Sequence, residues 1–317
     1  MANNFIDIVS QAQVIATAYS SEVLKPLRPN YVFDQVAKRK VWEMSRPPIK
    51  GDVLQFPVLG AIAANTAALD ATASAITGSV KTVYTRRNVT LALYGDHATI
   101  DTLVLPAESF VEVAGDVVWS LTDQAMNSMN LVARLALTNN KFADEVSGTL
   151  STTYHFYGSN GTVSTMGPLK AVDCRKIKEK MLSDNVQPFE DGMYVCILHP
   201  TVATQLRAET GNASWGAAVL AGDQSAARRF NGSIGNFEGI NFVVNNQVPN
   251  LTNTATAYFI GADGLGKGIG SELRIKPKST LSGNHDNLLT IYWDSLVGYR
   301  VIRRESVRVI STTNTVL

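Results

Sequence analysis

Residues Pro106–Leu137 read PAESFVEVAGDVVWSLTDQAMNSMNLVARLAL and form the most strongly patterned stretch of this 317-residue chain. Pro106 suits the first turn of a helix, and Asn139-Asn140 supplies a stop signal. The apolar residues recur every three or four positions, as an α-helix requires: Phe110, Ala114, Val117, Leu121, Ala125, Met129, Val132 and Ala136. At 1.5 Å per residue the helix would be roughly 45–50 Å long. Such a length predicts a plate-like molecule rather than a compact enzyme domain.

Two extended segments precede this helix and are separated by a tract of small residues. The first is Val53–Val58, where Pro57 favours the edge of a sheet because proline lacks the backbone N–H. The second is Ser79–Tyr94, in which apolar residues are interspersed with threonine and arginine. The tract between them, Gly60–Gly78, is rich in alanine and almost uncharged. Because loops this long inside a domain usually have a function, we expect a long hairpin that acts as a contact arm.

Residues 1–50 are expected to form an N-terminal arm. Prolines at positions 26, 29, 47 and 48 prevent a long helix. A segment interrupted in this way buries little surface by itself, so we expect it to lie on another surface of its own or a neighbouring subunit.

The chain after the long helix alternates between helices and strands. Thr149–Gly167 reads as a loop or a weak hairpin. Amphipathic helices at Pro168–Leu182 and Pro200–Glu209 flank the apolar strand Met193–Leu198, an order typical of an α/β layer. Further strands are expected at Phe242–Val244, at Ala257–Ile260, at Leu273–Lys276 and from Asn287 onward.

The composition excludes some functions without choosing among the rest. Only 17% of the residues are charged, less than the usual quarter, and the net charge of +1 argues against a dedicated nucleic-acid binder. A chain with so little charge often hides surface in subunit contacts, although on composition alone an ordinary alanine-rich enzyme is the more frequent case. No apolar run reaches membrane-spanning length and no signal peptide precedes the chain, so we expect maturation in a cytoplasm.

One stretch imitates a phosphate-binding loop. Gly261–Lys267, GADGLGK, matches the GxxxxGK part of that motif. Gly268 then stands where serine or threonine would hold magnesium, and the residues that follow predict a loop and a strand instead of a helix. We therefore expect no nucleotide site here.

No other pattern predicts catalytic or metal chemistry. Cys174 and Cys196 do not form a CxxC pair, and Cys196 lies in an apolar run typical of a small core residue. The histidines are scattered, without an HExxH pair or a cysteine at ligand spacing: His97, His155, His199 and His285. We predict no catalytic, cofactor-binding or metal-binding residues, although distant segments can assemble a catalytic triad that spacing does not reveal.

The order of these segments resembles that of the HK97-fold major capsid proteins of tailed bacteriophages. Tyr194–Pro200, followed by a helix, is similar to the strand–proline–helix segment of that family's A domain. Asn231–Asn246 resembles its glycine-punctuated stretch, and Val248-Pro249 follows as expected. Leu288–Arg308 resembles its closing strands. By order of elements the resemblance covers nearly the whole chain.

This resemblance implies an α+β, HK97-like capsid fold in five parts. They are an N-terminal arm (1–50), a long E-loop hairpin (51–95), a P domain (96–168) with a spine helix at about 106–137, an A domain (169–285), and closing strands shared by the P and A domains (286–317). The hairpin would lie over a neighbouring subunit. Some relatives form a lysine–asparagine crosslink; Lys81 lies in the hairpin, but no motif identifies its acceptor, so this chemistry is not transferred.

The resemblance also implies a function. It indicates a structural, non-enzymatic major capsid protein that self-assembles into hexamers and pentamers of an icosahedral shell enclosing double-stranded DNA. The implied partners are further copies of the chain, a separate scaffolding protein, a portal, in some particles a decoration protein, and the packaged DNA held without sequence specificity. No membrane and no cofactor are implied, and the location would be the virion, after assembly in the host cytoplasm. Two alternatives stay open: an encapsulin-like shell around a protein cargo, and a soluble enzyme with an unrecognised site.

Overall fold

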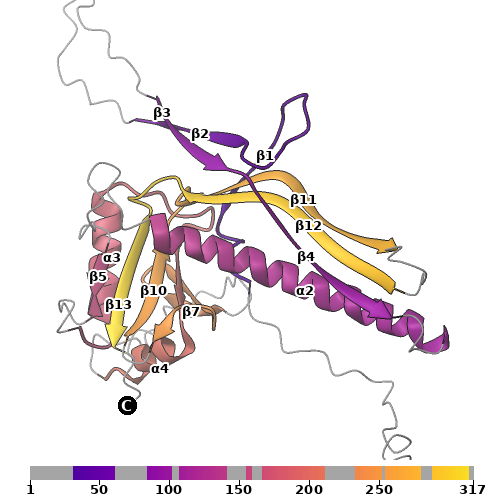
Figure 1. The fold of residues 1–317 in the computed structure, drawn as a ribbon. Coiled ribbons are helices and arrows are strands. Elements are labelled where there is room, and N and C mark those ends of the chain that lie inside the picture. The colour runs from indigo at the N-terminus through magenta and orange to yellow at the C-terminus, as the bar shows by residue number, and fades with distance from the viewer. Residues whose placement is uncertain are drawn as a thin grey trace, which may run out of the picture.

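The computed structural model is a mixed α+β protein in which one long helix runs beneath extended strands (Figure 1). The structure describes residues 31–60, 84–101, 107–140, 155–158, 166–210, 233–251, 254–279 and 288–313. Some expectations therefore lie outside the described residues. They concern the first thirty residues, the part of the tract Gly60–Gly78 that follows Gly60, Lys81 and His285.

The larger sheet has the strand order β5-β13-β10-β6-β8-β7, with β9 beside β10. Strand β10 is antiparallel to both β13 and β6, whereas β6 and β8 are parallel. Most of the loop or weak hairpin expected over Thr149–Gly167 lies outside the described residues; β5 within it pairs in parallel with β13, and Gly167 N–H donates to the Gly158 carbonyl oxygen over 2.9 Å. The strands of this sheet are β5 (His155–Tyr157), β6 (Tyr194–Leu198), β7 (Ser233–Phe237), β8 (Ile240–Val244), β9 (Asn250–Leu251), β10 (Thr254–Ile260) and β13 (Val307–Thr313).

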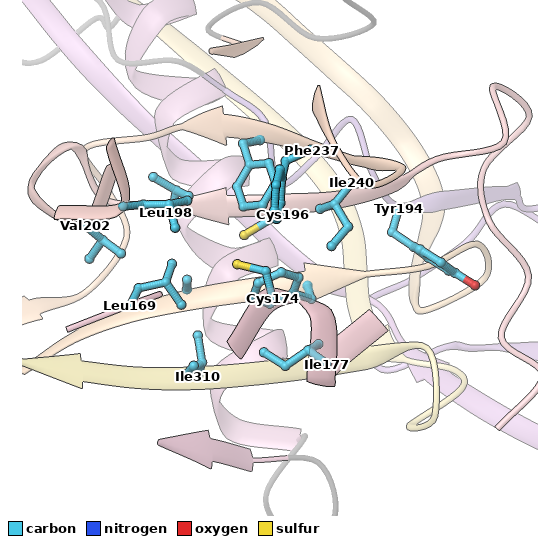
Figure 2. Close-up of a cluster of buried hydrophobic side chains, with 14 of the residues drawn as sticks. Leu169, Cys174, Ile177, Tyr194, Cys196, Leu198, Val202, Phe237, Ile240 and Ile310 are labelled. Carbon is cyan, nitrogen blue, oxygen red and sulfur yellow. The ribbon is translucent and has the colours of Figure 1, made fainter. Parts of the chain in front are cut away.

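Both faces of this sheet are buried. Helices α3 (Ala171–Ser183) and α4 (Pro200–Ala208) cover one face, which confirms the two amphipathic helices. Strand β6 divides its side chains between the faces: Tyr194, Cys196 and Leu198 pack with the helices (Figure 2), and Val195 and Ile197 pack on the opposite side. Burial on both sides explains the unbroken apolar run of this strand.

The smaller sheet has the order β1-β11-β12-β4 and is dominated by two long antiparallel strands. We expected a strand only at Leu273–Lys276, but β11 extends over Leu265–Ser279. Its glycine-rich first half has low strand propensity and is held by pairing with β12. The other strands are β1 (Lys38–Val41), β4 (Ala92–Asp101) and β12 (Leu288–Val301).

Helix α2 (Ala107–Asn140) joins the two sheets and includes the helix expected over 106–137. Its middle packs against the smaller sheet through Leu121, Ala125 and Met129, which contact Ile291 and Trp293. With 34 residues it is about 51 Å long. The helix therefore forms a rigid connection along most of the molecule (Figure 1).

The last turns of α2 pack against the larger sheet. Ala133, Ala136 and Leu137 are buried there. The sequence pattern placed Val132 on the buried line, but Val132 is only half-buried. The apolar line shifts by one residue because the helix passes from one sheet to the other.

The expected hairpin is present at its base as strands β2 (Val53–Leu59) and β3 (Tyr84–Thr90), which pair antiparallel. The single extended segment expected over Ser79–Tyr94 is instead divided at Leu91. Leu91 is buried, and its backbone N–H donates to the carbonyl oxygen of Asp52 over 2.8 Å. This bond turns the chain out of the hairpin and into β4.

Candidate functional site

The glycines of the phosphate-loop look-alike lie in a strand. Gly266, Lys267 and Gly268 belong to β11, so they do not open a helix that could bind phosphate. Alternate residues of a strand share one face, and here the shared face is the one that the hairpin covers. We call this platform the glycine seat; its members are Gly266, Gly268 and Gly270 of β11 and Gly298 of β12.

The glycine seat lets the hairpin approach the sheet more closely than any side chain would allow. A Cβ atom at Gly298 would stand 2.2 Å from the backbone oxygen of Thr90. A Cβ atom at Gly268 would stand 2.9 Å from Leu54 Cδ1. Real Cβ atoms do not approach heavy atoms this closely. At Gly298 the neighbour is backbone, so only glycine fits, whereas at Gly268 the end of the Leu54 side chain would have to move.

The two faces of the hairpin differ. The inner face carries Leu54, Phe56 and Val89, which are buried on the glycine seat. The outer face ends at Leu59 and Tyr84, which lie opposite each other in register and are 49% and 64% exposed. The base of the hairpin is thus fixed on the sheet, and Leu59 and Tyr84 present apolar surface at the far end of its described strands. The hairpin lies above β11 and β12 in Figure 1.

The loop between β1 and β2 is held by a local ion pair. Arg46 donates to both carboxylate oxygens of Asp52, over 2.6 and 2.9 Å, and these bonds lower the pKa of Asp52 below its ordinary value. The Arg46 guanidinium also lies 5.2 Å from the ring centre of Trp42. The loop keeps Met44 and Ile49 exposed. These two side chains add exposed apolar surface near the base of the hairpin.

The segment that leads into β1 is anchored by Asp34. Its carboxylate accepts hydrogen bonds from Lys267 Nζ over 2.6 Å and from the Tyr299 hydroxyl over 2.5 Å. The burial of Tyr299, and secondarily the negative charge of Asp34, raise the pKa of that hydroxyl above its ordinary value. Lys267, the lysine of the look-alike motif, is therefore part of a structural ion pair and does not face a phosphate site.

A second polar cluster ties α2 to the larger sheet. Asn130 is fully buried and accepts a hydrogen bond from the Phe33 backbone N–H over 2.8 Å. Its side-chain amide donates to the side-chain oxygen of Gln247. The Arg134 guanidinium donates to the backbone oxygen of the same residue. These contacts fix the long helix relative to both the entering segment and the chain after β8.

Within the described residues, one histidine and both cysteines occupy structural positions. His97 is exposed on β4, and the side chain of His155 lies outside the described residues. His199 caps α4 by accepting the Thr201 backbone N–H, and partial burial lowers the pKa of its ring. Cys174 and Cys196 point toward one another in the core (Figure 2), and burial raises the pKa of both thiols. Thiols with raised pKa values make poor nucleophiles.

Other chemistry also finds little support within the described residues. No group of three or more potential metal ligands occurs in this part of the chain. None of the helices described there is long and apolar enough to cross a membrane.

Three open cavities in the described regions have volumes of about 240, 470 and 340 Å³. The first lies between β1 and the hairpin and is lined by basic residues.

Comparison with known proteins gives a consistent result for the fold. No family model matches the sequence, and no curated protein is similar to it in sequence. The capsid subunit of cyanophage Pam1 has a TM-score of 0.68 at 12% identity, over 99% of both chains. The head structure of Helicobacter pylori bacteriophage KHP40 has a TM-score of 0.65 at 11% identity, over 99% of this chain and 98% of that one. The SrpI encapsulin complex of Synechococcus elongatus has a TM-score of 0.58 at 10% identity, over 97% of this chain and 96% of that one.

The chain therefore has the fold of a phage major capsid protein, along nearly its whole length. The α+β architecture expected from the resemblance is confirmed at this level. Sequence reasoning missed the glycine seat, although it noticed the glycines. The signal was available: a glycine at every second position, 266, 268 and 270, is the period of a strand and not of a phosphate loop.

Proposed function

We propose that this protein is the major subunit of an icosahedral shell of the tailed-phage type, assembled from hexamers and pentamers. The observation that carries the proposal is the similarity to phage capsid structures over the whole chain, since a likeness confined to one domain would leave the rest free for another function. The protein acts as a structural subunit, and we assign it no enzymatic activity.

The proposed parts follow the five-part division. Residues 1–50 are the N-terminal arm, 51–95 the E-loop, 96–168 the P domain, 169–285 the A domain and 286–317 the closing strands that the P and A domains share. The fixed base of the hairpin and the exposed side chains of Leu59 and Tyr84 support an E-loop that covers a neighbouring subunit. The length of α2 supports a spine for the P domain.

Further partners follow from the same proposal. The shell encloses double-stranded DNA without sequence specificity, and assembly in the host cytoplasm uses a separate scaffolding protein and a portal. A decoration protein joins the outside in some particles, and the mature location is the virion. The near-neutral charge of the chain suits a wall that tolerates DNA without trapping it.

An encapsulin-like compartment is the second candidate, because the SrpI encapsulin complex shares the fold. It differs from the first only in content, a protein cargo in place of DNA. A soluble enzyme is the third candidate, and it requires a site that none of the described residues forms in an obvious way.

The test is to express the chain with and without its genomic neighbours and to image the high-mass fraction by negative-stain electron microscopy. Closed icosahedral shells or sheets of hexamers and pentamers are expected. The ratio of absorbance at 260 and 280 nm then distinguishes DNA-filled from protein-filled particles. A small oligomer under every condition would overturn the proposal and favour an enzyme.

A further inference from the structure

A basic cavity lies between β1 and the hairpin. It has a volume of about 240 Å³, and its basic residues come from β1 and from the turn after β12. Its lining consists of Lys38, Arg39, Lys40, Phe56, Pro57, Val58, Asp263, Ile302 and Arg303. Asp263 is the one carboxylate of the lining, and a second carboxylate, that of Asp34, lies 3.6 Å from the Arg39 guanidinium.

Two of the four cations have a carboxylate partner, because Lys38 pairs with Asp263 and Arg39 with Asp34. Lys40 Nζ donates to the backbone oxygen of Gln55 over 2.9 Å, and a carbonyl carries no net charge to neutralise it. Lys38 pairs with Asp263 over 2.8 Å, which is the one carboxylate of the lining. Arg303 adds a cation that takes part in none of the ion pairs described above. The cavity therefore favours an anion.

The lining also favours a particular kind of anion. Phe56, Val58 and Ile302 give the cavity an apolar part next to its cations. A DNA duplex would reach such a site through its phosphates, which bring no apolar surface to these side chains. An acidic side chain on a peptide brings both a carboxylate and hydrocarbon. A volume of about 240 Å³ is also smaller than the roughly 300–1,000 Å³ of typical ligand pockets, and suits one or two side chains.

We infer that this cavity receives an acidic segment of a second copy of this chain, and that the contact helps to set the position of one subunit beside the next. The inference rests on the proposed shell function. The chain as a whole carries 28 basic and 27 acidic residues, so a local basic excess implies an acidic excess elsewhere on the same chain. The cavity also adjoins the exposed outer face of β2, because Pro57 and Val58 line it and Leu59 follows.

The first experiment locates the acidic segment. Unlabelled and ¹⁵N-labelled subunits are mixed before assembly and treated with a water-soluble carbodiimide, which joins a lysine amine to a carboxylate as an amide. Mass spectrometry of the digested particles is expected to find mixed-label amides between Lys38 or Lys40 and an aspartate or glutamate. Links from these lysines only within one chain, to Asp263 for example, would overturn the inference.

The second experiment tests the charge. Arg303→Glu is expected to raise the subunit concentration needed for assembly by about tenfold at low salt, because like charges then meet at the contact. The difference is expected to shrink in 1 M salt, where charges are screened beyond about 3 Å. Lys176→Glu, on the exposed surface of α3, is the matched control and should assemble as the unmodified chain does. Circular dichroism of both variants confirms that the subunit is folded.

The outcomes separate this inference from the function on which it rests. Shells that form normally from Arg303→Glu, without the mixed-label amides, overturn the inference and leave the shell function standing. Shells that form from Arg303→Glu but retain less DNA would assign the cavity to nucleic acid and also overturn it. Failure of the unmodified chain to assemble under any condition overturns both.

Discussion

Gly298 lies directly against the carbonyl oxygen of Thr90, so that even a methyl group at position 298 would stand 2.2 Å from that oxygen. The contact joins Thr90, the last residue of β3, to the C-terminal part of β12. It is backbone against backbone, so rotation of a side chain cannot relieve the clash.

Gly298→Ala is therefore expected to lower the free energy of unfolding by about 1–3 kcal/mol, the range for overpacked sites. Urea unfolding of the dissociated subunit measures this as a lower midpoint at constant slope. Gly115→Ala is the control: Gly115 is exposed on α2 and a Cβ there meets nothing within 4 Å. That change should stabilise the subunit by about 0.5–1 kcal/mol. Equal midpoints for the Gly298 variant and the unmodified chain would contradict the seated hairpin.

Asp34→Asn is expected to destabilise the subunit by about 1–3 kcal/mol, because it leaves a poorly hydrated lysine without its counter-charge. The side chain of Lys267 is only 12% exposed. The exposed pair Lys38–Asp263 offers a comparison, and Asp263→Asn should cost less than about 1 kcal/mol. Thermal unfolding of both variants in one buffer compares their stabilities. A larger loss of stability for Asp263→Asn than for Asp34→Asn would show that Asp34 is not the anchor.

The loop between β1 and β2 is expected to loosen in acid. The pKa of Asp52 is lowered chiefly by its hydrogen bonds with Arg46, so the ordering contribution is present above the ordinary value of about 4 and disappears as the pH falls through the lowered folded value. Because Arg46 lies over Trp42, the difference in fluorescence between the unmodified chain and Trp42→Phe should change only below about pH 4. In Asp52→Asn this acid transition should be absent.

Replacing residues 61–77 by a short turn should leave the subunit folded but prevent closed shells, because the deletion spares the glycine seat while removing the far end of the proposed contact arm. Circular dichroism reports the fold, and electron microscopy reports the shells. Normal closed shells from the shortened chain would show that the hairpin is not an assembly arm.

Two neighbouring side chains of α2 should differ sharply in their effect, because one is buried and the other is exposed. Leu121→Ala removes a buried side chain that contacts the smaller sheet, and should cost about 2–5 kcal/mol. Val118→Ala, three residues earlier, alters a side chain that is 38% exposed and should change stability by less than about 0.5 kcal/mol. Val117→Asp places a charge in a half-buried position beside the same cluster and should also destabilise the subunit. Urea midpoints in the reverse order would mean that the buried face is misassigned.

The long helix could be predicted from the sequence because its information is local. Residues 106–137 repeat an apolar residue every three or four positions, and the structure has a helix at Ala107–Asn140. The apolar strand β6 and the helices on either side of it were predictable for the same reason. In each of these elements the spacing of the apolar residues indicates the type of secondary structure.

The alternating glycines at 266, 268 and 270 indicate a strand, but neither the hairpin that packs on them nor the basic cavity could be predicted, because each contact joins segments far apart in the chain. Leu54 meets Gly268, and Lys38 meets Asp263. A glycine strand has no apolar period of its own, so in one dimension the stretch looks like a phosphate loop. Its meaning appears only when the hairpin is placed on it.

The late position of β11 and β12 in the chain has a consequence for synthesis. The inner face of the hairpin, with Leu54 and Phe56, leaves the ribosome long before Gly298 does. At about 5–20 residues per second, the roughly 200 residues from Val89 to Gly298 take about 10–40 s to translate. Throughout that interval the underside of the hairpin has no platform to rest on. A nascent chain of this protein must therefore carry an exposed apolar surface. Slow translation or a scarcity of chaperones would prolong or worsen that exposure and lower the yield of soluble subunits.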